Sequence, residues 1–498
     1  MTLAVLSQAL SLVLDPYVLW VVFASAAFGL FVGAIPGLTA TMATALLVPV
    51  TFFMPPVPAI AAIVTATAMA IFAGDIPSCL LRMPGTAASA AYTDEAYAMT
   101  KKGHGEMALG AGLVFSAVGG LFGTAVLITA APALAEVALK FSSFEYFWLV
   151  VLGLSSAVFL TFGSPLKGVV SLLLGLLVAA VGLDNPAAFP RFTFGNAELS
   201  GGLTLIPIMI GMFAVSEILR NVAAMEQPWE MAQARIGNVF TGMWRLAKRY
   251  PLGILRGSAL GTAIGALPGA GADIAAWMSY AISKKFSKEP EKFGTGHVEG
   301  IVEAGASNNS ALAGAWIPSL VFGIPGDSIT AIVIGVLYIK GLNPGPTVFM
   351  EKAPEMYAIF FIFIIANLLM LPLGVAAIKG AKQLLRAPRE LLMPVILLFC
   401  IVGSFAINNS LFGVVLMLVF GLLAYVMEEN GFPVAPAILG MVLGAMLEEH
   451  FISSMIKSDG RLLGFFERPI AGALGGLALL VIAWPLVRAW LERKGGKP

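Results

Sequence analysis

Apolar stretches long enough to cross a lipid bilayer recur along this chain from one end to the other. Charged residues make up 11% of its 498 residues, whereas a soluble domain carries roughly 25%. Apolar residues make up 59% and are spread along the whole sequence rather than gathered in one anchor. The bilayer is therefore the main solvent of this fold, and the sequence predicts an all-α membrane protein that crosses it many times.

About twelve hydrophobic segments are predicted, and several are too short to span about 30 Å of hydrocarbon alone. They cover residues 16–33, 59–73, 106–131, 147–162, 168–181, 203–219, 252–266, 311–321, 356–378, 391–407, 411–427, 434–447 and 471–487. Irregular backbone at membrane depth is tolerated only where it packs inside protein or lines a cavity. Short segments broken by proline and glycine therefore indicate an internal site built from broken helices or re-entrant hairpins.

Several functions leave motifs that this sequence lacks. The net charge is +1 without a dense basic patch, which disfavours nucleic-acid binding. The only Gly-Lys dipeptide precedes Pro498, so the sequence has no phosphate loop for nucleotide hydrolysis. It contains no His-Glu-x-x-His or Gly-x-Ser-x-Gly motif, and its three histidines lack metal-ligand spacing. We expect neither an enzyme nor a bound cofactor or metal, and Cys79 and Cys400 are predicted to be small core residues.

Two motifs of the first half recur in the second half in the same order. Residues 29–37 match residues 261–269 at every glycine and at the proline, and residues 76–85 match residues 317–326. Two matches in register argue against coincidence. We predict two homologous transmembrane repeats with a polar interfacial linker between them and an extra helix with a basic tail at the end. The predicted boundaries are 1–222, 223–250, 251–470 and 471–498.

Duplicated halves with Pro-Gly interruptions are typical of secondary transporters, whose site lies where the repeats meet near the midplane. We predict that the repeats are inverted. A half-helix that begins after Pro36-Gly37 or Pro268-Gly269 leaves backbone N–H groups unpaired and directs its positive end at the site, where it attracts carboxylates. Glycines that recur every fourth residue also predict close packing against another helix. They are Gly253, Gly257, Gly261, Gly265 and Gly269.

Each predicted half-helix start carries a polar residue, and the two halves differ in charge. Asp273 and Asp327 take the positions of Thr41 and Thr86. N-capping is one explanation, because aspartate and threonine both cap helices well. A half-helix whose first turn carries a neutral polar residue can also donate hydrogen bonds to an anion. A half-helix whose first turn carries an acidic residue is better suited to bind a cation or a proton. We therefore hypothesise that the first-half starts bind the substrate and that the second-half acids bind the coupling ion.

Other polar residues in apolar surroundings extend both predicted sites. Ser307-Asn308-Asn309-Ser310 and Asn408-Asn409 interrupt apolar stretches, where amide oxygens suit Na⁺ and where asparagine pairs also form turns. Asp75 and Arg82 either neutralise each other, or Arg82 offers its planar guanidinium to a carboxylate. The predicted substrate-binding residues are Gly37, Thr39, Thr41, Arg82, Gly85, Thr86, Gly269, Asn308, Asn309 and Gly326. The predicted cation-coupling residues are Asp273, Ser307, Asn308 and Asp327.

The chain resembles the large membrane subunit of the tripartite tricarboxylate transporters, the TctA family, over residues 20–470. Specific stretches carry this resemblance, including GAIPGLT at 33–39, PGAGADIAA at 268–276 and GIPGD at 323–327. The others are residues 83–86, 182–195, 286–294, 341–346, 408–412 and 431–436. This resemblance implies that the family's functional pattern is kept at Pro36, Gly37, Pro84, Gly85, Thr86, Pro268, Gly269, Asp273, Asn308, Asn309, Pro325 and Gly326. The sequence departs from the family pattern at Arg82, where a neutral polar residue is usual.

The resemblance implies a multi-pass secondary carrier of the bacterial inner membrane that imports an organic carboxylate such as citrate. It implies a Na⁺ or proton gradient as the driving force. The implied partners are a small four-helix membrane subunit, TctB-like, and a periplasmic solute-binding protein, TctC-like. We expect an elevator-like movement of the broken-helix core against a scaffold. An anion channel is the alternative function, and an intramembrane enzyme is a more distant one.

Overall fold

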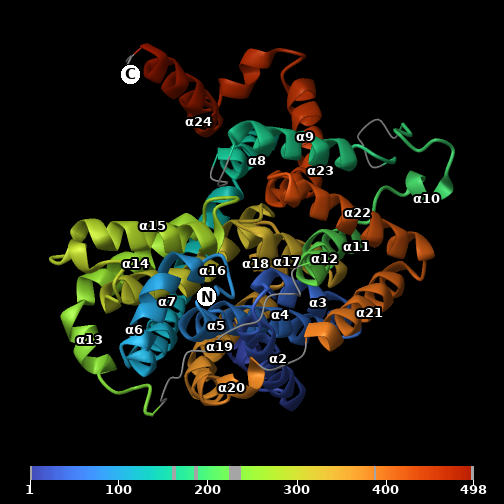
Figure 1. Cartoon of the computed structure of the whole chain (residues 1–498). Helices are drawn as coiled ribbons and strands as arrows, with labels where there is room; N and C mark the ends of the chain where they lie inside the picture. Colours follow the sequence, from blue (N-terminus) through green and yellow to red (C-terminus); the bar gives the residue numbers. More distant parts are fainter. Residues whose placement is uncertain (1–2, 160–163, 184–188, 224–236, 386–388, 495–498) are drawn as a thin grey trace. The chain divides into compact units, whose positions relative to one another are not determined.

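A computed structural model describes residues 3–159, 164–183, 189–223, 237–385 and 389–494 (Figure 1). These residues form helices throughout and no β-strand, with one isolated bridge between Gly182 and Arg191. Eight of the described helical segments are long and apolar enough to cross a membrane. The prediction of an all-α polytopic membrane protein is therefore confirmed.

The long apolar segments fall close to the predicted ones, and shorter apolar helices lie between them. The long segments are Pro16–Ala34, Pro56–Leu81, Gly105–Ala138, Leu205–Ala223, Ala353–Lys379, Glu390–Ile407, Leu411–Glu429 and Val434–Lys457. The shorter ones are Leu3–Val13, Ala40–Phe52, Ser143–Val158, Pro165–Ala179, Ser328–Ile339 and Pro469–Ala483.

The chain packs into two compact units, each made of two separate stretches. Unit 1 is Met1–Ala135 with Ile206–Val426, and unit 2 is Glu136–Leu205 with Met427–Pro498. These packing units differ from the two homologous repeats predicted from the sequence, which are separated by the 223–250 linker. The division into repeats stays a prediction. Residues 224–236 of that linker lie outside the described residues.

Unit 1 contains most of the helices. Its first stretch forms α1 (Leu3–Val13), α2 (Pro16–Ala34), α3 (Ala40–Phe52), α4 (Pro56–Ala73), α5 (Asp75–Leu81), η1 (Ser89–Tyr92), α6 (Thr93–Lys101) and most of α7 (Gly105–Ala138). Its second stretch begins with α11 (Leu205–Ile210), the π-helix η2 (Gly211–Val215), α12 (Ser216–Ala223), α13 (Met243–Arg249), α14 (Pro251–Gly265), α15 (Gly271–Phe286) and η3 (Pro290–Lys292). It continues with α16 (Val298–Phe322), α17 (Ser328–Ile339), α18 (Val348–Glu351), α19 (Ala353–Lys379), α20 (Ala381–Leu384), α21 (Arg389–Asn408) and most of α22 (Leu411–Glu429).

Helix α16 lies at the centre of unit 1 and is approached closely on two sides. The glycines Gly257, Gly261 and Gly265 of α14 face it, and an added Cβ at each would lie 2.2–2.3 Å from a backbone carbonyl oxygen of α16. On the side of α7, an added Cβ at Gly119 would lie 1.9 Å from the carbonyl oxygen of Ala306. The packing prediction for the α14 glycines is therefore confirmed at these three positions.

Helix α16 is also longer than its sequence suggests. The predicted apolar segment was 311–321, whereas the helix begins at Val298. Its first half carries Glu303 and the 307–310 polar run, which lower the hydropathy but are completely or almost completely buried by surrounding protein. Because neighbouring helices satisfy or enclose these groups, the backbone continues through them.

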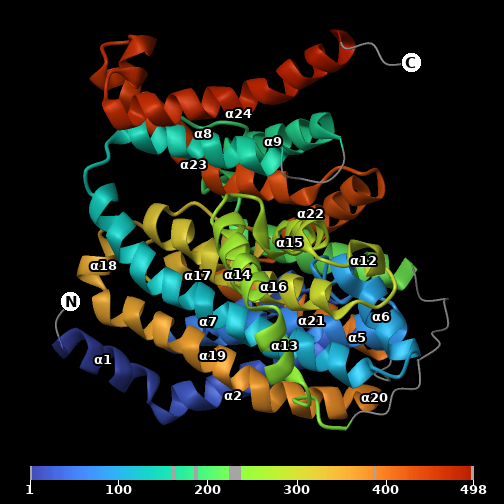
Figure 2. The ribbon, with the colours of Figure 1, turned by 90° about the vertical axis from the view of Figure 1, so that its left-hand side faces the viewer.

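Helices α7 and α19 run side by side in unit 1, as Figure 2 shows. An added Cβ at Gly120 of α7 would lie 1.9 Å from Oδ1 of Asn367 on α19, and Gly374 of α19 faces the side chain of Leu113. Small residues thus allow the long helices of this unit to approach one another, as they do in membrane proteins generally.

Unit 2 joins helices from both of its stretches. They are α8 (Ser143–Phe159), α9 (Pro165–Ala179), α10 (Ala197–Ser200), α23 (Val434–Lys457), η4 (Leu462–Phe466) and α24 (Pro469–Lys494). Buried Glu145 accepts a hydrogen bond from Arg468 Nε at 2.6 Å, and Trp148 Nε1 donates to the carbonyl oxygen of Phe465 at 2.9 Å. These contacts fasten η4 and the start of α24 to α8.

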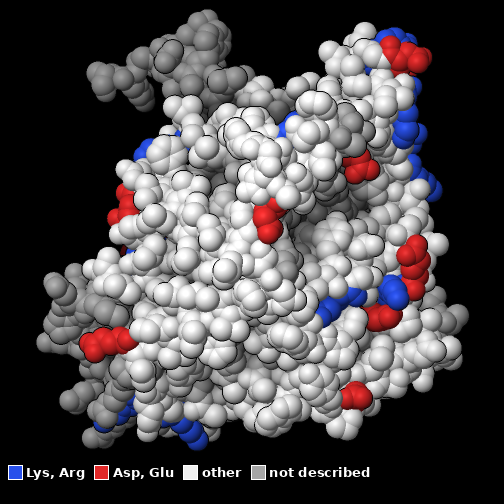
Figure 3. All heavy atoms as spheres, turned by 90° about the vertical axis from the view of Figure 1, so that its right-hand side faces the viewer, with Lys and Arg blue, Asp and Glu red and all other residues white. Residues whose placement is uncertain are grey.

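One face of the molecule has the largely uncharged surface that is typical of a lipid-facing protein. The face in Figure 3 is mostly uncharged, with isolated acidic and basic residues. In unit 1, the apolar side chains of Leu398, Val402 and Leu422 on α21 and α22 are more than half exposed. Exposed aliphatic side chains on long apolar helices are stable in hydrocarbon and unfavourable in water.

Candidate functional site

The first Pro-Gly break lies between α2 and α3. Gly37 has a φ of +86°, a conformation that glycine adopts without steric cost, and its carbonyl oxygen accepts a hydrogen bond from Asn221 Nδ2 at 2.7 Å. Thr39 is the N-cap of α3, where its Oγ1 accepts from the N–H of Met42 at 3.1 Å. Thr41 follows in the first turn, and Gly37, Thr39 and Thr41 are half-buried. The break therefore leaves an accessible helix start.

The second break follows α5 and brings Gly85 against two other backbones. An added Cβ at Gly85 would lie 2.5 Å from the Cα of Gly74 and 2.8 Å from the carbonyl oxygen of Gly33. Thr86 and Ser89 then cap each other, because each backbone N–H donates to the other's side-chain oxygen at 3.1 Å. Thr86 is buried and makes the hydrogen bond typical of a cap, but the N-cap of the following helix η1 is Ala88, so the N-capping interpretation is not confirmed for Thr86.

The two breaks of the second half contact each other directly. Gly269 lies between α14 and α15 with a φ of +83°, and its N–H donates to the carbonyl oxygen of Gly326 at 2.8 Å. Gly271 opens α15 with a φ of +61°, and an added Cβ there would lie 2.8 Å from the Cβ of Asp327. Any side chain at Gly271 would therefore displace the loop that carries Asp327.

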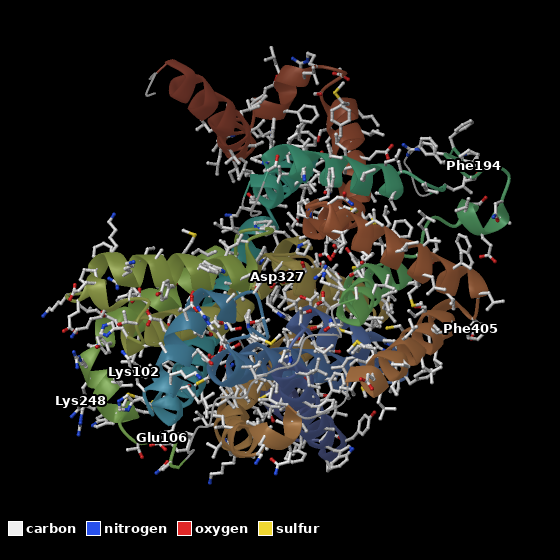
Figure 4. All side chains as sticks on the ribbon, viewed as in Figure 1. Lys102, Glu106, Phe194, Lys248, Asp327 and Phe405 are labelled. Atoms are coloured by element: carbon white, nitrogen blue, oxygen red, sulfur yellow. The ribbon has the colours of Figure 1, made fainter. Side chains whose placement is uncertain are left out.

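Asp327 caps α17 through a capping box with Thr330. The N–H of Thr330 donates to Asp327 Oδ1 at 2.8 Å, and the N–H of Asp327 donates to Thr330 Oγ1 at 2.9 Å. Asp327 is half-buried, and in Figure 4 it lies well away from Lys102, Glu106 and Lys248 at the lower left of the view. The N-capping interpretation is confirmed for this aspartate, which uses Oδ1 in the cap and keeps Oδ2 beside Gly271.

Asp273 meets groups from both halves of the sequence. It lies in the first turn of α15, close enough to Asp327 for the two carboxylate charges to interact, and beside the backbone of Ala88 in the loop after Thr86. It is surrounded by protein on several sides, yet its side chain remains exposed to solvent. The predicted residues Thr86, Gly269, Gly326, Asp273 and Asp327 therefore lie in neighbouring loops and helix starts.

Residues that match between the two halves make the same local contacts. Three kinds of contact are shared. In the first, a glycine packs against a backbone carbonyl oxygen of another helix. In the second, a serine hydroxyl donates to a carbonyl oxygen four residues earlier, and in the third, two residues accept each other's backbone N–H through their side-chain oxygens. The matched pairs are Gly33–Ala70 with Gly265–Ala311, Ser78–Gly74 with Ser319–Ala315, and Thr86–Ser89 with Asp327–Thr330. Arg82 and its counterpart Gly323 both adopt left-handed backbone, with φ of 59° and 67°.

Ser307, Asn308 and Asn309 lie inside α16 rather than at a break. The turn-forming alternative is wrong for this asparagine pair, because the helix runs on without a gap and these polar side chains are buried within the protein. Asn308 Nδ2 donates to Tyr92 Oη at 3.4 Å, and Asn309 Nδ2 to the carbonyl oxygen of Ala68 at 3.5 Å. Both Oδ1 atoms and Ser307 Oγ are buried without a hydrogen-bond partner among the described residues, so they are available as ligands.

The later asparagine pair behaves differently. Helix α21 ends at Asn408, and Asn409 has a φ of +49° in the turn before α22. Asparagine tolerates this left-handed conformation better than most residues. The turn-forming interpretation is therefore confirmed for Asn409.

Arg82 does not pair with Asp75. It terminates α5, and its Nε contacts Asp94 Oδ1 on α6 at 2.9 Å in an exposed ion pair. The pairing considered from the sequence is wrong, because α5 places the two residues at opposite ends of about 10 Å of helix. Arg82 lies in the loop that leads to Gly85, with 63% of its side chain exposed.

Asp75 forms a buried polar group that the sequence did not assign to the site. Its side chain is 4% exposed, and Oδ1 accepts a hydrogen bond from Tyr92 Oη at 2.6 Å. Through Tyr92 it is linked to Asn308 of α16. An acid within an apolar stretch was the only sequence signal, since its partners belong to other elements.

Glu95 of α6 is a second buried acid outside the predicted set, and it binds the loop before α16. Its carboxylate accepts hydrogen bonds from Tyr280 Oη at 2.9 Å, from the N–H groups of Gly296 and His297 at 2.6 and 2.7 Å, and from the N–H of Gly294. These donors come from the second half of the sequence, whereas Glu95 belongs to the first. The acid therefore holds α6 and the loop between α15 and α16 together.

Comparison of the sequence with known proteins finds a transporter family. Residues 19–439 match the sequence model described as "Tripartite tricarboxylate transporter TctA family". No solved structure matches the chain.

Two relatives from Agrobacterium vitis are similar over most of their own lengths. An uncharacterized 52.8 kDa protein in the TAR-I ttuC' 3' region is 36% identical over 463 residues, which cover 93% of this chain and 92% of the relative. An uncharacterized protein in the TAR-II ttuC' 3' region is 37% identical over 227 residues, which cover 46% of this chain and 94% of the relative.

Proposed function

Because the chain belongs to the tripartite tricarboxylate transporter TctA family, we propose that it is a secondary active transporter subunit that imports an organic carboxylate such as citrate or a dicarboxylate. Membership of a family of transporter subunits supports a role in transport rather than in catalysis. Uptake is coupled to Na⁺ or H⁺, and a periplasmic solute-binding protein delivers the substrate.

The observation that carries this proposal is the meeting of helix starts from both halves of the sequence. Asp273 at the start of α15 lies beside Ala88 in the first half and close to Asp327 at the start of α17. Helix N-termini provide backbone donors and a positive dipole end for a carboxylate, and nearby acids attract a cation. A transporter that moves a carboxylate together with a cation needs the two binding sites side by side, because binding of one ion then favours binding of the other.

We assign the predicted residues to two adjoining sites. The substrate site is formed by the first-half starts with Gly269, Gly326, Asn308, Asn309 and Arg82, and the coupling site by Asp273, Ser307, Asn308 and Asp327. Asn308 belongs to both because an amide offers an oxygen to a cation and hydrogens to a carboxylate. No separate cofactor is required beyond the coupling ion.

The proposed architecture is a pair of inverted repeats whose broken helices form a mobile core. Matched contacts such as Gly33–Ala70 with Gly265–Ala311 support two equivalent halves. In an elevator movement this core carries the site across the bacterial inner membrane past an outer scaffold. The small four-helix membrane subunit completes the membrane part. Pro-Gly breaks found at equal depth in inward and outward states would contradict this movement.

The function is tested by uptake into proteoliposomes that contain this chain with its small membrane partner. Labelled carboxylates and the binding protein are supplied outside, under a Na⁺ gradient, a proton gradient or neither. We expect concentrative uptake that requires the binding protein and one gradient. Flux down the substrate's own gradient without either requirement would favour an anion channel, and chemical conversion of the substrate would favour a membrane enzyme.

Asp327→Asn tests the coupling role of the helix start. The amide oxygen of asparagine still accepts the Thr330 N–H, so the cap is preserved while the negative charge is lost. We expect the coupling-ion concentration for half-maximal uptake to rise roughly tenfold or more, which corresponds to ~1.4 kcal/mol. Asp15→Asn makes the same exchange at the N-cap of α2 and serves as the control. Ion dependence equal to that of the unmutated protein would overturn the assignment of Asp327.

Arg82→Gly tests whether this exposed arginine binds the substrate. Glycine suits the left-handed backbone that Arg82 and Gly323 share, so the loop is not strained by the change. We expect the KM for the carboxylate to rise roughly tenfold with little change in kcat, because a bidentate ion pair is lost. Asp94→Asn breaks the ion pair but keeps the arginine. An equal KM in Arg82→Gly would remove Arg82 from the substrate site.

A further inference from the structure

Asp75 is a buried acid at the start of α5, and among the described residues no cationic side chain is bonded to its carboxylate. Its side chain is 4% exposed, and Oδ2 is buried without a hydrogen-bond partner among the described residues. Oδ1 is held by Tyr92 Oη at 2.6 Å. A buried ionised carboxylate is costly unless a cation or several donors stabilise it, so the neutral, protonated carboxyl is the form that this position accommodates.

The described groups that contact Asp75 or interact with it are uncharged donors and small residues rather than cations. The titratable side chains that interact with it are Tyr92 of η1 and Cys79 of α5, while α7 contributes Gly112, and Asn308 of α16 is reached through Tyr92. Arg82, at the other end of α5, contacts Asp94, and Arg256 of α14 binds the buried carboxylate of Glu303 through two hydrogen bonds of 2.6 Å.

The space around Oδ2 favours a proton over a metal cation. The backbone of α7 closes on this oxygen, since an added Cβ at Gly112 would lie 2.6 Å from it. Hard cations need several oxygen ligands arranged around them. A proton needs one lone pair, and it converts Oδ2 into a donor.

We propose that Asp75 is a proton-carrying site of this transporter, in which one proton from water binds Oδ2, turns the carboxylate into a neutral carboxyl, and is later released to water on the other side of the membrane. This inference rests on the proposed function and names the proton as a coupling ion bound apart from Asp273 and Asp327. One O–H bond forms on loading and breaks on release, and the site changes its charge from −1 to 0 and back. Tyr92 keeps its own proton and orients Asp75 throughout.

The burial of Asp75 fits a carrier rather than a channel. In this conformation the carboxyl is closed off from solvent, so a proton enters or leaves only after a rearrangement of the helices around it. A site that opens to one side at a time is what couples a proton gradient to substrate movement. An open route through the same carboxyl would dissipate the gradient.

Asp75→Asn tests the proposal, since asparagine has a similar shape but carries no exchangeable acid proton. We expect the variant to lose proton-driven accumulation by tenfold or more, to keep carboxylate exchange between equal concentrations on both sides, and to show uptake that no longer depends on pH. Asp459→Asn is the control, because this exposed aspartate of unit 2 has a φ of 50° that asparagine also tolerates. Asp75→Asn with intact proton-driven accumulation, or with a change in Na⁺ dependence alone, would overturn the proposal.

Difference infrared spectroscopy gives a readout that does not depend on transport. A protonated carboxyl in an apolar environment produces its own carbonyl band, which we expect in the unmutated protein and in Asp459→Asn but not in Asp75→Asn. Absence of this band from the unmutated protein at every pH at which it is folded would overturn the proton site. If the unmutated protein accumulates no carboxylate in proteoliposomes, the proposed function fails, and the infrared result still decides whether Asp75 binds a proton.

Discussion

Gly119→Ala is expected to destabilise unit 1 by about 3 kcal/mol, at the upper end of the usual cost of overpacking a core. The added methyl group would lie 1.9 Å from the carbonyl oxygen of Ala306 and within 2.8 Å of that residue's carbonyl carbon and Cα. All three atoms belong to the backbone of α16, so no side-chain rotation relieves the contact. Helices α7 and α16 would have to separate along their length.

The measurement is the midpoint of thermal unfolding of the detergent-solubilised protein, followed by the loss of the monodisperse peak in size-exclusion chromatography. We expect a fall of several degrees and a lower yield from the membrane. Gly305→Ala is the matched control, because this glycine of α16 also faces α7 but an added Cβ would lie 3.9 Å from the nearest atoms, an ordinary contact. A midpoint for Gly119→Ala equal to that of Gly305→Ala would show that the helices are farther apart than described.

Gly85→Ala and Gly326→Ala are expected to reduce uptake roughly a hundredfold each, since misplacing a reacting or binding group by about 1 Å commonly costs this much. An added Cβ at Gly85 would lie 2.8 Å from the carbonyl oxygen of Gly33, and one at Gly326 would lie 2.6 Å from that of Gly265. Either methyl group would push a Pro-Gly loop away from the neighbouring helix end. Similar losses at both positions are expected because the two loops make matched contacts.

This second prediction is measured as the initial rate of carboxylate uptake per amount of folded protein in proteoliposomes. Gly201→Ala is the control, because this exposed glycine of unit 2 has a φ of −73° and an added Cβ would lie 3.8 Å from the nearest atom. Full uptake by Gly85→Ala together with loss in Gly326→Ala would mean that only the second-half loop contributes to the site. Full uptake by both would remove the Pro-Gly loops from the mechanism.

Local sequence patterns were sufficient to predict the helical spans, the breaks and the packing of α14. Hydropathy and the spacing of small residues depend on neighbours within the same helix, so they can be recognised without knowledge of the fold. The capping of α17 by Asp327 belongs to this class, since its partner Thr330 lies three residues further on.

Features that depend on distant segments were predicted less well. The predicted apolar segment begins only at residue 311, after the 307–310 polar run, because hydropathy does not register that α7 and α14 enclose this run. Asp75 was considered beside Arg82, the nearest basic residue in sequence, whereas its hydrogen-bond partner Tyr92 is placed by the turn of η1. The composition of unit 2 likewise escaped prediction, because α8 and α9 pack with helices from the far end of the chain.

The substrate and coupling residues as a set remain a prediction, and the structure narrows how they could work together. Thr86, Asp273 and Asp327 lie in adjoining loops, so a carboxylate and a cation bound there would neutralise each other over a short distance. Arg82 stands apart from this group in an exposed ion pair. Its proposed place in the substrate site therefore requires the carboxylate to replace Asp94 as its partner.

The four hydrogen bonds that Glu95 accepts have a mechanical consequence. They join α6, from the first half of the sequence, to Tyr280 and the 294–297 loop of the second, and Lys102 adds a further link to the carbonyl oxygen of Thr295. If α6 moved relative to Tyr280 and the 294–297 loop during transport, all of these hydrogen bonds would have to break in the same conformational change. The flexible joints of the transport cycle should therefore lie elsewhere, and α6, α15 and the start of α16 should travel as one rigid body.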